Sequence, residues 1–221
     1  MSERETWQSF LNKWQTWWPE WAVAEAFIPE PQRELARAWL ALRGEWADAA
    51  WAGQDPTPGA AKLGWWVEEL QGWSQGAHRH PLGGLLQSKP VAWSTLAARL
   101  PALGSSRTLE GDLASAVRSL NTVAQGLTET AAVLFEGTPA EPQDVAITLL
   151  AERALRQPPS GVQGELSARG LLEQPRLPGG TRPERIHAAL LRWRLQRRVA
   201  NQEGATPRWR ALWASWQAAR G

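Results

Sequence analysis

Apolar side chains recur every three or four positions along most of this chain, and this spacing restricts the folds that the chain can adopt. The longest run lies within residues 109–136, where the apolar positions are Leu109, Leu113, Ala116, Leu120, Val123, Leu127, Ala131 and Leu134. A period near 3.6 gathers these side chains on one face of an α-helix, whereas a half-buried β-strand alternates with a period of two. No stretch alternates in that way with β-branched enrichment. The sequence therefore predicts an all-α fold, a helical bundle that forms a single domain over residues 1–221.

Capping residues and prolines divide the chain into further predicted helices. Ser2 begins a capping-box pattern before a tryptophan-rich helix, which Pro19 is expected to interrupt. Further helices are predicted over residues 35–53, 57–76, 109–136 and 143–156, with short helices in 81–104 and two final helices after residue 181. The expected N-caps of the later helices are Thr57, Thr108, Thr181 and Thr206. The Pro/Gly/Ser-rich stretch 158–180 is predicted to be a loop.

The chain has sixteen tryptophans, no tyrosine and no cysteine. Tryptophan is large and carries an N–H group, so this number calls for a large core, a wet interface, or both. The lack of cysteine excludes a thiolate nucleophile, a disulfide and a cysteine-ligated metal. The imidazoles are His78, His80 and His187. Since His78 and His80 are two positions apart, they do not share a helix face, and we expect them in a loop or a cap rather than at a metal.

Positive charge is concentrated toward the C-terminal end. Residues 181–221 contain nine arginines and two acidic residues, a local charge of +7, whereas the preceding residues carry −5 within a total of +2. Such a basic face can meet phosphate or acidic lipid, although a solvated basic helix is the commoner explanation, and we expect no nucleic-acid partner. The first residues lack a secretory-signal pattern and no apolar run approaches roughly 20 residues. These features predict a cytoplasmic location, with peripheral contact with the inner membrane as a further expectation.

Acidic pairs are the remaining candidates for chemistry, because the sequence has no phosphate-binding glycine loop and no G-x-S-x-G nucleophile elbow. Glu68 and Glu69 are adjacent. Glu45 and Asp48 are three positions apart and would share one helix face. Pairs of this kind are most often solvated at the surface.

Three segments follow one another in the order and spacing of a known enzyme family. Residues 37–48 read RAWLALRGEWAD, residues 62–70 read KLGWWVEEL and residues 80–86 read HPLGGLL. An early helix with an arginine and acidic residues, a K/R-L-x-W-W helix and an H-P-apolar stretch are similar to those of the squalene/phytoene synthase family, whose members condense prenyl diphosphates. The resemblance is clearest over residues 35–90, and it implies a shortened isoprenoid-synthase-type helical domain over residues 1–221.

In that family two aspartate-rich motifs face each other and hold Mg²⁺, which neutralises the diphosphate leaving group. Here the aspartate positions of the first motif hold Trp46, Ala47 and Ala50, while Glu45 and Asp48 are out of register. The segment that matches the second motif, residues 147–157, has no aspartate either. Both departures disfavour metal-dependent ionisation of a prenyl diphosphate.

The resemblance nevertheless implies candidate residues for each part of a prenyl diphosphate site. The carboxylates that would act in catalysis are Glu45, Asp48, Glu69 and Glu152. The diphosphate-binding candidates are Arg43, Lys62, Arg153 and Arg156, and the cavity-lining candidates are Trp39, Trp46, Trp66 and Leu120. No residue is assigned as a metal ligand and no cofactor is expected, with Mg²⁺ needed only by an active enzyme.

Three functional hypotheses remain open. The leading one is a non-catalytic squalene/phytoene synthase-like protein that binds a prenyl or lipid ligand or a protein partner. The second is an active Mg²⁺-dependent transferase that uses displaced carboxylates on farnesyl or geranylgeranyl diphosphate. The third is a helical scaffold whose tryptophan-rich first helix docks on a partner or membrane surface, although core packing is the favoured explanation of that helix. A cavity filled by tryptophan side chains would exclude both substrate turnover and prenyl binding inside the bundle and leave only surface-mediated roles, whereas an open apolar cavity would permit them. Several exposed tryptophans in the first helix would favour the third hypothesis.

Overall fold

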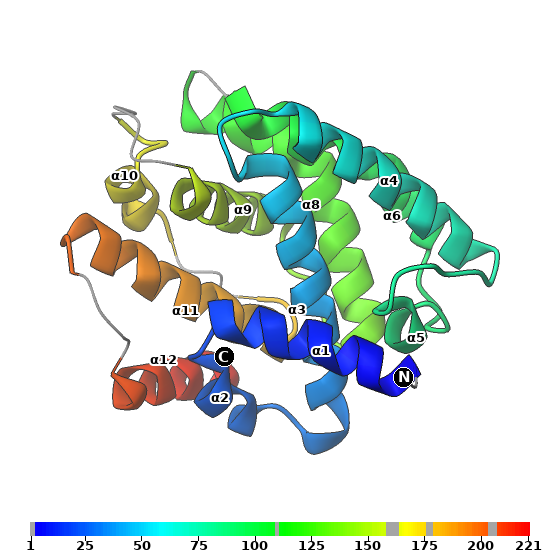
Figure 1. The fold of residues 1–221 in the computed structure, drawn as a ribbon. Helices are drawn as coiled ribbons and strands as arrows, with labels where there is room; N and C mark the ends of the chain where they lie inside the picture. The colour runs from blue at the N-terminus through cyan, green and yellow to red at the C-terminus, as the bar shows by residue number, and fades with distance from the viewer. Residues whose placement is uncertain (1–2, 109–110, 158–163, 176–178, 203–206) are drawn as a thin grey trace.

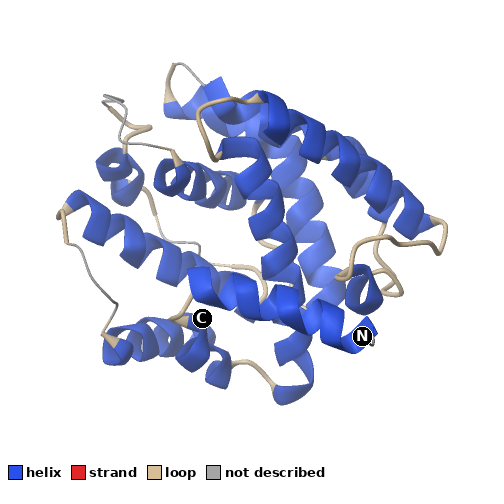
Figure 2. Cartoon of the chain, viewed as in Figure 1, coloured by secondary structure: helices blue, strands red, loops and turns tan. Residues whose placement is uncertain are grey.

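The computed structural model describes residues 3–108, 111–157, 164–175, 179–202 and 207–221, and within these ranges it contains helices and loops but no strand (Figure 2). The predicted all-α fold class is confirmed. The α-helices are α1 Glu3–Trp17, α2 Trp21–Ala24, α3 Glu30–Trp51, α4 Thr57–Ser74, α5 Gly83–Leu86, α6 Trp93–Arg99, α7 Pro101–Ser105, α8 Leu113–Phe135, α9 Pro142–Arg156, α10 Ala168–Glu173, α11 Arg182–Val199 and α12 Arg208–Arg220. Short 3₁₀ helices, η1 Glu25–Phe27 and η2 Ser106–Thr108, follow α2 and α7.

Two long helices, α3 and α8, run through the middle of the bundle (Figure 1). Helices α4 and α6 pack on each other at one side, and α4 also contacts α3. At the other side α9 packs on α8, and α11 contacts α9, α10 and α12. Helix α1 crosses the bundle and contacts α3. In the part of the chain that the structure describes, no helix is long and apolar enough to cross a membrane.

Several helix ends differ from the sequence predictions. Helix α8 begins at Leu113 with Asp112 as its N-cap, whose side chain accepts from the Ser115 amide at 2.7 Å, so the expected cap Thr108 is wrong. Thr57 lies inside α4, and its amide donates instead to the Asp55 carboxylate at 2.9 Å. The expected cap Thr181 is confirmed, because it forms a capping box with Glu184. Ser2 and Thr206 lie outside the described residues.

The stretch 158–180 is not a loop throughout. Helix α10 occupies Ala168–Glu173, and the Ser167 side chain caps it by accepting from the Gly170 amide at 3.1 Å. Leu171 is buried and packs in the core beneath α10. A short helix therefore forms where a local cap and one buried apolar side chain compensate for poor intrinsic helix propensity.

Tryptophan fills the interior of the bundle. Trp39, Trp46 and Trp66 are at most 1% exposed and meet edge to face, with ring centroids 5.9 Å apart for the first two and 6.2 Å apart for the last two. Leu120 is also fully buried. These four side chains, the cavity-lining candidates, thus pack against one another or their neighbours as core.

The first helix contributes mainly to this core. Trp14, Trp18 and Trp21, which begins α2, are at most 7% exposed, and only Trp17 among the tryptophans of this region is exposed, at 69%. The first helix therefore lacks the several exposed tryptophans that would favour docking of this helix on a partner or membrane surface. Core packing explains its apolar stripe.

Helices α3 and α4 approach each other closely at Gly59, which gives a matched test of packing within one helix. A Cβ at Gly59 would lie 2.1 Å from the Ala49 carbonyl oxygen, whereas a Cβ at Gly64, one helical turn further on, would meet nothing within 4 Å. We expect Gly59→Ala to lower the free energy of unfolding by about 1–3 kcal/mol, because α3 and α4 must separate. Gly64→Ala should raise it by about 0.5–1 kcal/mol through helix propensity. Urea denaturation of both variants checks the prediction, and equal effects would contradict it.

Candidate functional site

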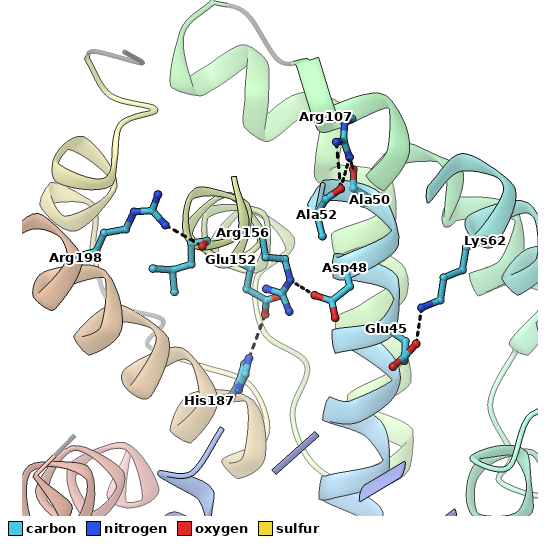
Figure 3. Close-up of polar contacts among 11 residues, drawn as sticks. Glu45, Asp48, Ala50, Ala52, Lys62, Arg107, Glu152, Arg156, His187 and Arg198 are labelled. Atoms are coloured by element: carbon cyan, nitrogen blue, oxygen red, sulfur yellow. Dashed lines mark hydrogen bonds and ion pairs between the residues drawn. The ribbon is translucent and has the colours of Figure 1, made fainter. Parts of the chain in front are cut away.

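An ionic cluster joins α3, α9 and α11 around the buried Glu152 (Figure 3), and it reaches solvent at Asp48. The Glu152 carboxylate lies 3.4 Å from Arg43 Nη2, 3.1 Å from His187 Nε2 and 3.8 Å from Arg156 Nη1. Arg156 also pairs with Asp48 through a 2.8 Å contact from Nε to Oδ1. We call Arg43, Asp48, Glu152, Arg156 and His187 the Glu152 cluster. It brings together four of the residues that the resemblance nominated, from segments more than a hundred positions apart.

Helix geometry explains how these side chains meet. Glu152 and Arg156 are four positions apart on α9, so they occupy one face of that helix. Arg43 and Asp48 come from α3 and reach Glu152 and Arg156 of α9, and His187 comes from α11, which also packs on α9. The cluster is therefore a product of the three-helix contact rather than of any local motif.

Burial and charge together fix the protonation states in the cluster. Glu152 is 2% exposed and His187 is 4% exposed. Burial alone would raise the pKa of Glu152. The hydrogen bond from His187 and the charges of Arg43 and Arg156 outweigh this effect and lower the pKa to about 2. Burial is the largest influence on His187 and lowers its pKa, which keeps the imidazole neutral. Because a carboxylate can only accept, the His187 Nε2–H donates to Glu152.

The carboxylates of the Glu152 cluster have basic side chains as partners. Each carboxylate in it is paired with arginine, and among the described residues no group of three or more His, Asp or Glu side chains is arranged to hold a metal ion. Mg²⁺ needs several oxygen ligands in near-octahedral geometry. An arginine-saturated carboxylate instead forms a neutralised, hydrogen-bonded link between helices.

The other nominated residues lie outside the cluster. Glu45 lies on the side of α3 that faces α4 and pairs with Lys62 of that helix at 2.6 Å, as Figure 3 shows. Arg153 donates to the Arg107 carbonyl oxygen at 3.2 Å. Glu45 and Lys62 thus connect α3 to α4, and Arg153 connects α9 to η2. None of these three side chains pairs with Glu152 in the cluster.

Glu69 closes the loop that contains the histidines. Its buried carboxylate accepts from the backbone amides of Arg79 and His80 at 2.7 and 2.8 Å, from Arg79 Nε at 3.0 Å and from Trp73 Nε1 at 2.9 Å. Burial raises the pKa of Glu69, yet these hydrogen bonds bring it below its usual value. Glu69 is therefore a capping carboxylate for the 77–80 loop, with its oxygens already occupied.

His80 makes the stability of the protein pH-dependent. Its ring packs on Phe10, Trp65 and Trp66, and burial lowers its pKa to about 4 from 6.5, although the charges of Glu45 and Glu69 oppose the change. Between these pH values the unfolded chain takes up a proton that the folded chain refuses, so stability must fall as the pH drops from 6.5 to 4. We expect His80 to contribute at most about 1.4 kcal/mol per pH unit over this range and no slope above it.

The variant His80→Asn isolates this effect. In the wild type the Leu82 amide donates a hydrogen bond to His80 Nδ1 at 3.2 Å. The Oδ1 of an asparagine can accept the same hydrogen bond, but an asparagine side chain does not titrate. We expect the variant to be less stable at pH 7, because ring packing is lost, and to show a flatter dependence between pH 6.5 and 4 in urea denaturation. Parallel pH profiles for variant and wild type would contradict the assignment.

A groove opens between α9, α10, α11 and α12, with a volume of about 600 Å³. Its apolar lining includes Ile147, Ala151, Ala189, Trp193, Trp209 and Trp213. The polar groups along it include Asp144, Arg192, Gln196 and Arg210, and burial raises the pKa of Asp144. A volume and lining of this kind are typical of small-ligand sites. None of the cavity-lining candidates named from the sequence lines this groove.

Sequence reasoning missed both His187 as a cluster member and the groove. His187 stands three positions after Glu184 on α11, but nothing local indicates that it faces α9. The groove depends on how α12 returns against α11, and the only sequence signal was the mixture of tryptophan and arginine in residues 207–221. No family model, curated protein or solved structure matches this chain.

Proposed function

We propose that this chain is a non-catalytic, squalene/phytoene synthase-like protein that acts by binding a prenyl or lipid ligand at its surface groove. The observation that carries the proposal is the pairing of Glu152 with Arg43, Arg156 and His187. A carboxylate in that setting does not recruit a divalent cation, because the cation would have to displace buried guanidinium groups. The resemblance over residues 35–90 supplies the ligand class.

The packing of the interior supports the same conclusion. A prenyl chain inside the bundle would have to displace Trp39, Trp46 and Trp66, whose rings are in mutual contact. Loss of the packing of one buried tryptophan side chain costs about 3–5 kcal/mol, so insertion of a prenyl chain among these rings is unfavourable. The groove between α9 and α12 offers apolar surface without that cost.

The groove also suits an amphiphile. Trp193, Trp209 and Trp213 provide apolar contact area, and Arg210 places a cation beside Trp209, 5.0 Å from its ring centroid. An apolar chain against the tryptophans and an anionic head at the arginine would satisfy both kinds of group. A prenyl or acyl chain with a phosphate head has this chemistry.

Two assays on the full chain test the proposal. With Mg²⁺ and farnesyl or geranylgeranyl diphosphate we expect no pyrophosphate release above a protein-free control, and release that depends on the protein would overturn the non-catalytic assignment. Titration of farnesyl diphosphate should change tryptophan fluorescence, because three tryptophans line the groove.

A matched pair of variants locates the binding. Ala189→Trp fills the groove and should weaken binding by at least about tenfold, or about 1.4 kcal/mol. Ala98→Trp adds the same side chain at an exposed position of α6 outside the groove and should leave binding unchanged. Equal affinities for the two variants would overturn the assignment of the groove.

A further inference from the structure

Four apolar side chains form an exposed stripe on α12. Trp209, Leu212, Trp213 and Trp216 are 65, 39, 56 and 37% exposed, and they follow one another at the spacing of one helix face. Among the described residues the remaining exposed large hydrophobics are Trp17 and Val133. We call these four residues the α12 stripe. The opposite face of α12 is packed, because Ala211 and Ser215 are buried and the helix contacts α11 and α2.

Positive charge surrounds the α12 stripe. Helix α12 contains Arg208, Arg210 and Arg220 and no acidic residue. The Arg210 and Arg220 guanidinium groups lie 5.0 and 4.6 Å from the ring centroids of Trp209 and Trp216. Residues 181–221 as a whole carry +7. Tryptophan and arginine side by side on a helix of 13 residues therefore present apolar rings and cations to the same solvent space.

We propose that the α12 stripe docks this protein on the surface of an anionic lipid bilayer. The rings would enter the headgroup region, where tryptophan is favoured because one part of it is apolar and its N–H is polar. The arginines would meet the phosphates of anionic lipids, which attract cations close to the bilayer surface. A helix with one buried face and one apolar, cation-flanked face lies in the plane of such a surface.

This inference rests on the proposed function, because the α12 stripe shares residues with the proposed ligand groove. Trp209 and Trp213 belong to the α12 stripe and also line the groove between α9 and α12. Docking would therefore bring the groove against the bilayer. A prenyl or lipid chain could then pass between membrane and groove without crossing water.

Charge complementarity favours a bilayer over a second copy of the chain. Two copies meeting through α12 would bring their arginines together, which is unfavourable. A stable dimer also needs roughly 1,200 Å² of buried surface or more, whereas four side chains of a single helix present less. An anionic bilayer satisfies the apolar side chains and the arginines together.

Vesicle sedimentation of the full-length protein tests the proposal. We expect the wild type to sediment with vesicles of phosphatidylcholine and phosphatidylglycerol, to show blue-shifted tryptophan fluorescence when bound, and to dissociate as salt increases. With phosphatidylcholine alone, binding should be at least about tenfold weaker. No sedimentation with the anionic vesicles, or equal binding to both kinds, would overturn the proposal.

Two variants assign the binding to α12. The triple change Trp209→Ser, Trp213→Ser and Trp216→Ser should weaken vesicle binding at least about tenfold, while Val133→Ser, at an exposed position of α8, should not. The double change Arg208→Glu and Arg210→Glu, which leaves every tryptophan in place, should have a similar effect, with the exposed Arg118→Glu as its control. Wild-type binding by both α12 variants would overturn the assignment. A dimer that the triple change abolishes, without vesicle binding, would overturn it in favour of a second copy.

The outcomes separate this inference from the proposed function. If the protein binds farnesyl diphosphate and releases no pyrophosphate but does not bind vesicles, the docking proposal alone is overturned. Pyrophosphate release would overturn the proposed function whether or not vesicles are bound.

Discussion

Replacement of Trp66 by alanine should lower the free energy of unfolding by about 3–5 kcal/mol. The Trp66 side chain is fully buried, and its ring centroid lies 6.2 Å from that of Trp46, 5.0 Å from that of Trp65 and 4.6 Å from that of His80. Its Nε1 has no hydrogen-bond partner among the described residues, so the expected loss comes from packing rather than from a broken hydrogen bond. Urea denaturation followed by circular dichroism measures the change.

Trp213→Ala is the matched control, because Trp213 is 56% exposed on α12. We expect a change within about 0.5 kcal/mol at that position. A change of less than about 1 kcal/mol for Trp66→Ala would mean that the bundle can collapse into the vacated space, and it would contradict the close packing described above.

Replacement of Glu152 by alanine should lower the free energy of unfolding by about 3–5 kcal/mol, because the change removes the carboxylate that pairs with the buried Arg43. Arg43 is 6% exposed and its Nε already has no hydrogen-bond partner among the described residues. His187 would also lose the acceptor for its Nε2–H. Glu45→Ala is the control, since Glu45 pairs with the exposed Lys62, and an exposed pair contributes about 0–1 kcal/mol.

A compensating double variant tests whether Arg43 and Glu152 stabilise the fold as a pair. Arg43→Met combined with Glu152→Leu replaces the ion pair by apolar side chains, and such replacements are often neutral or stabilising. We expect the double variant to recover most of the stability that Glu152→Ala loses. A double-mutant cycle in which the two changes add without coupling would show that Arg43 and Glu152 do not depend on each other.

The sequence predicted those features that depend on neighbours along the chain. The three-and-four spacing identified the long helices α3, α4, α8, α9 and α11, because a helix face is defined by residues within a few turns. The cap at Thr181 was predictable for the same reason, since its partner Glu184 is three positions away. The cap of α8 was mistaken because Thr108 and Asp112 both carry capping side chains, and the structure uses Asp112. Local propensity alone does not choose between two such candidates.

Part of the Glu152 cluster was nominated from the sequence. The resemblance nominated Arg43, Asp48, Glu152 and Arg156, and the structure brings these four residues together. It did not indicate that His187 would join them or that Glu69 would serve as a loop cap. Nor did the periodicity show which tryptophans are buried, because Trp14 and Trp213 occupy equally regular stripes on their helices.

The amino-acid sequence by itself determined that this chain is helical, where its long helices run, and that it contains no cysteine. Only the tertiary structure decided that Glu152 and Asp48 pair with arginines, that tryptophan fills the interior, and that the last helix keeps an exposed apolar stripe beside a groove. The physical reason is the range of the interactions. Helix formation depends on residues three or four apart, whereas Arg43 and Glu152 are separated by 109 positions and meet only when three helices pack together.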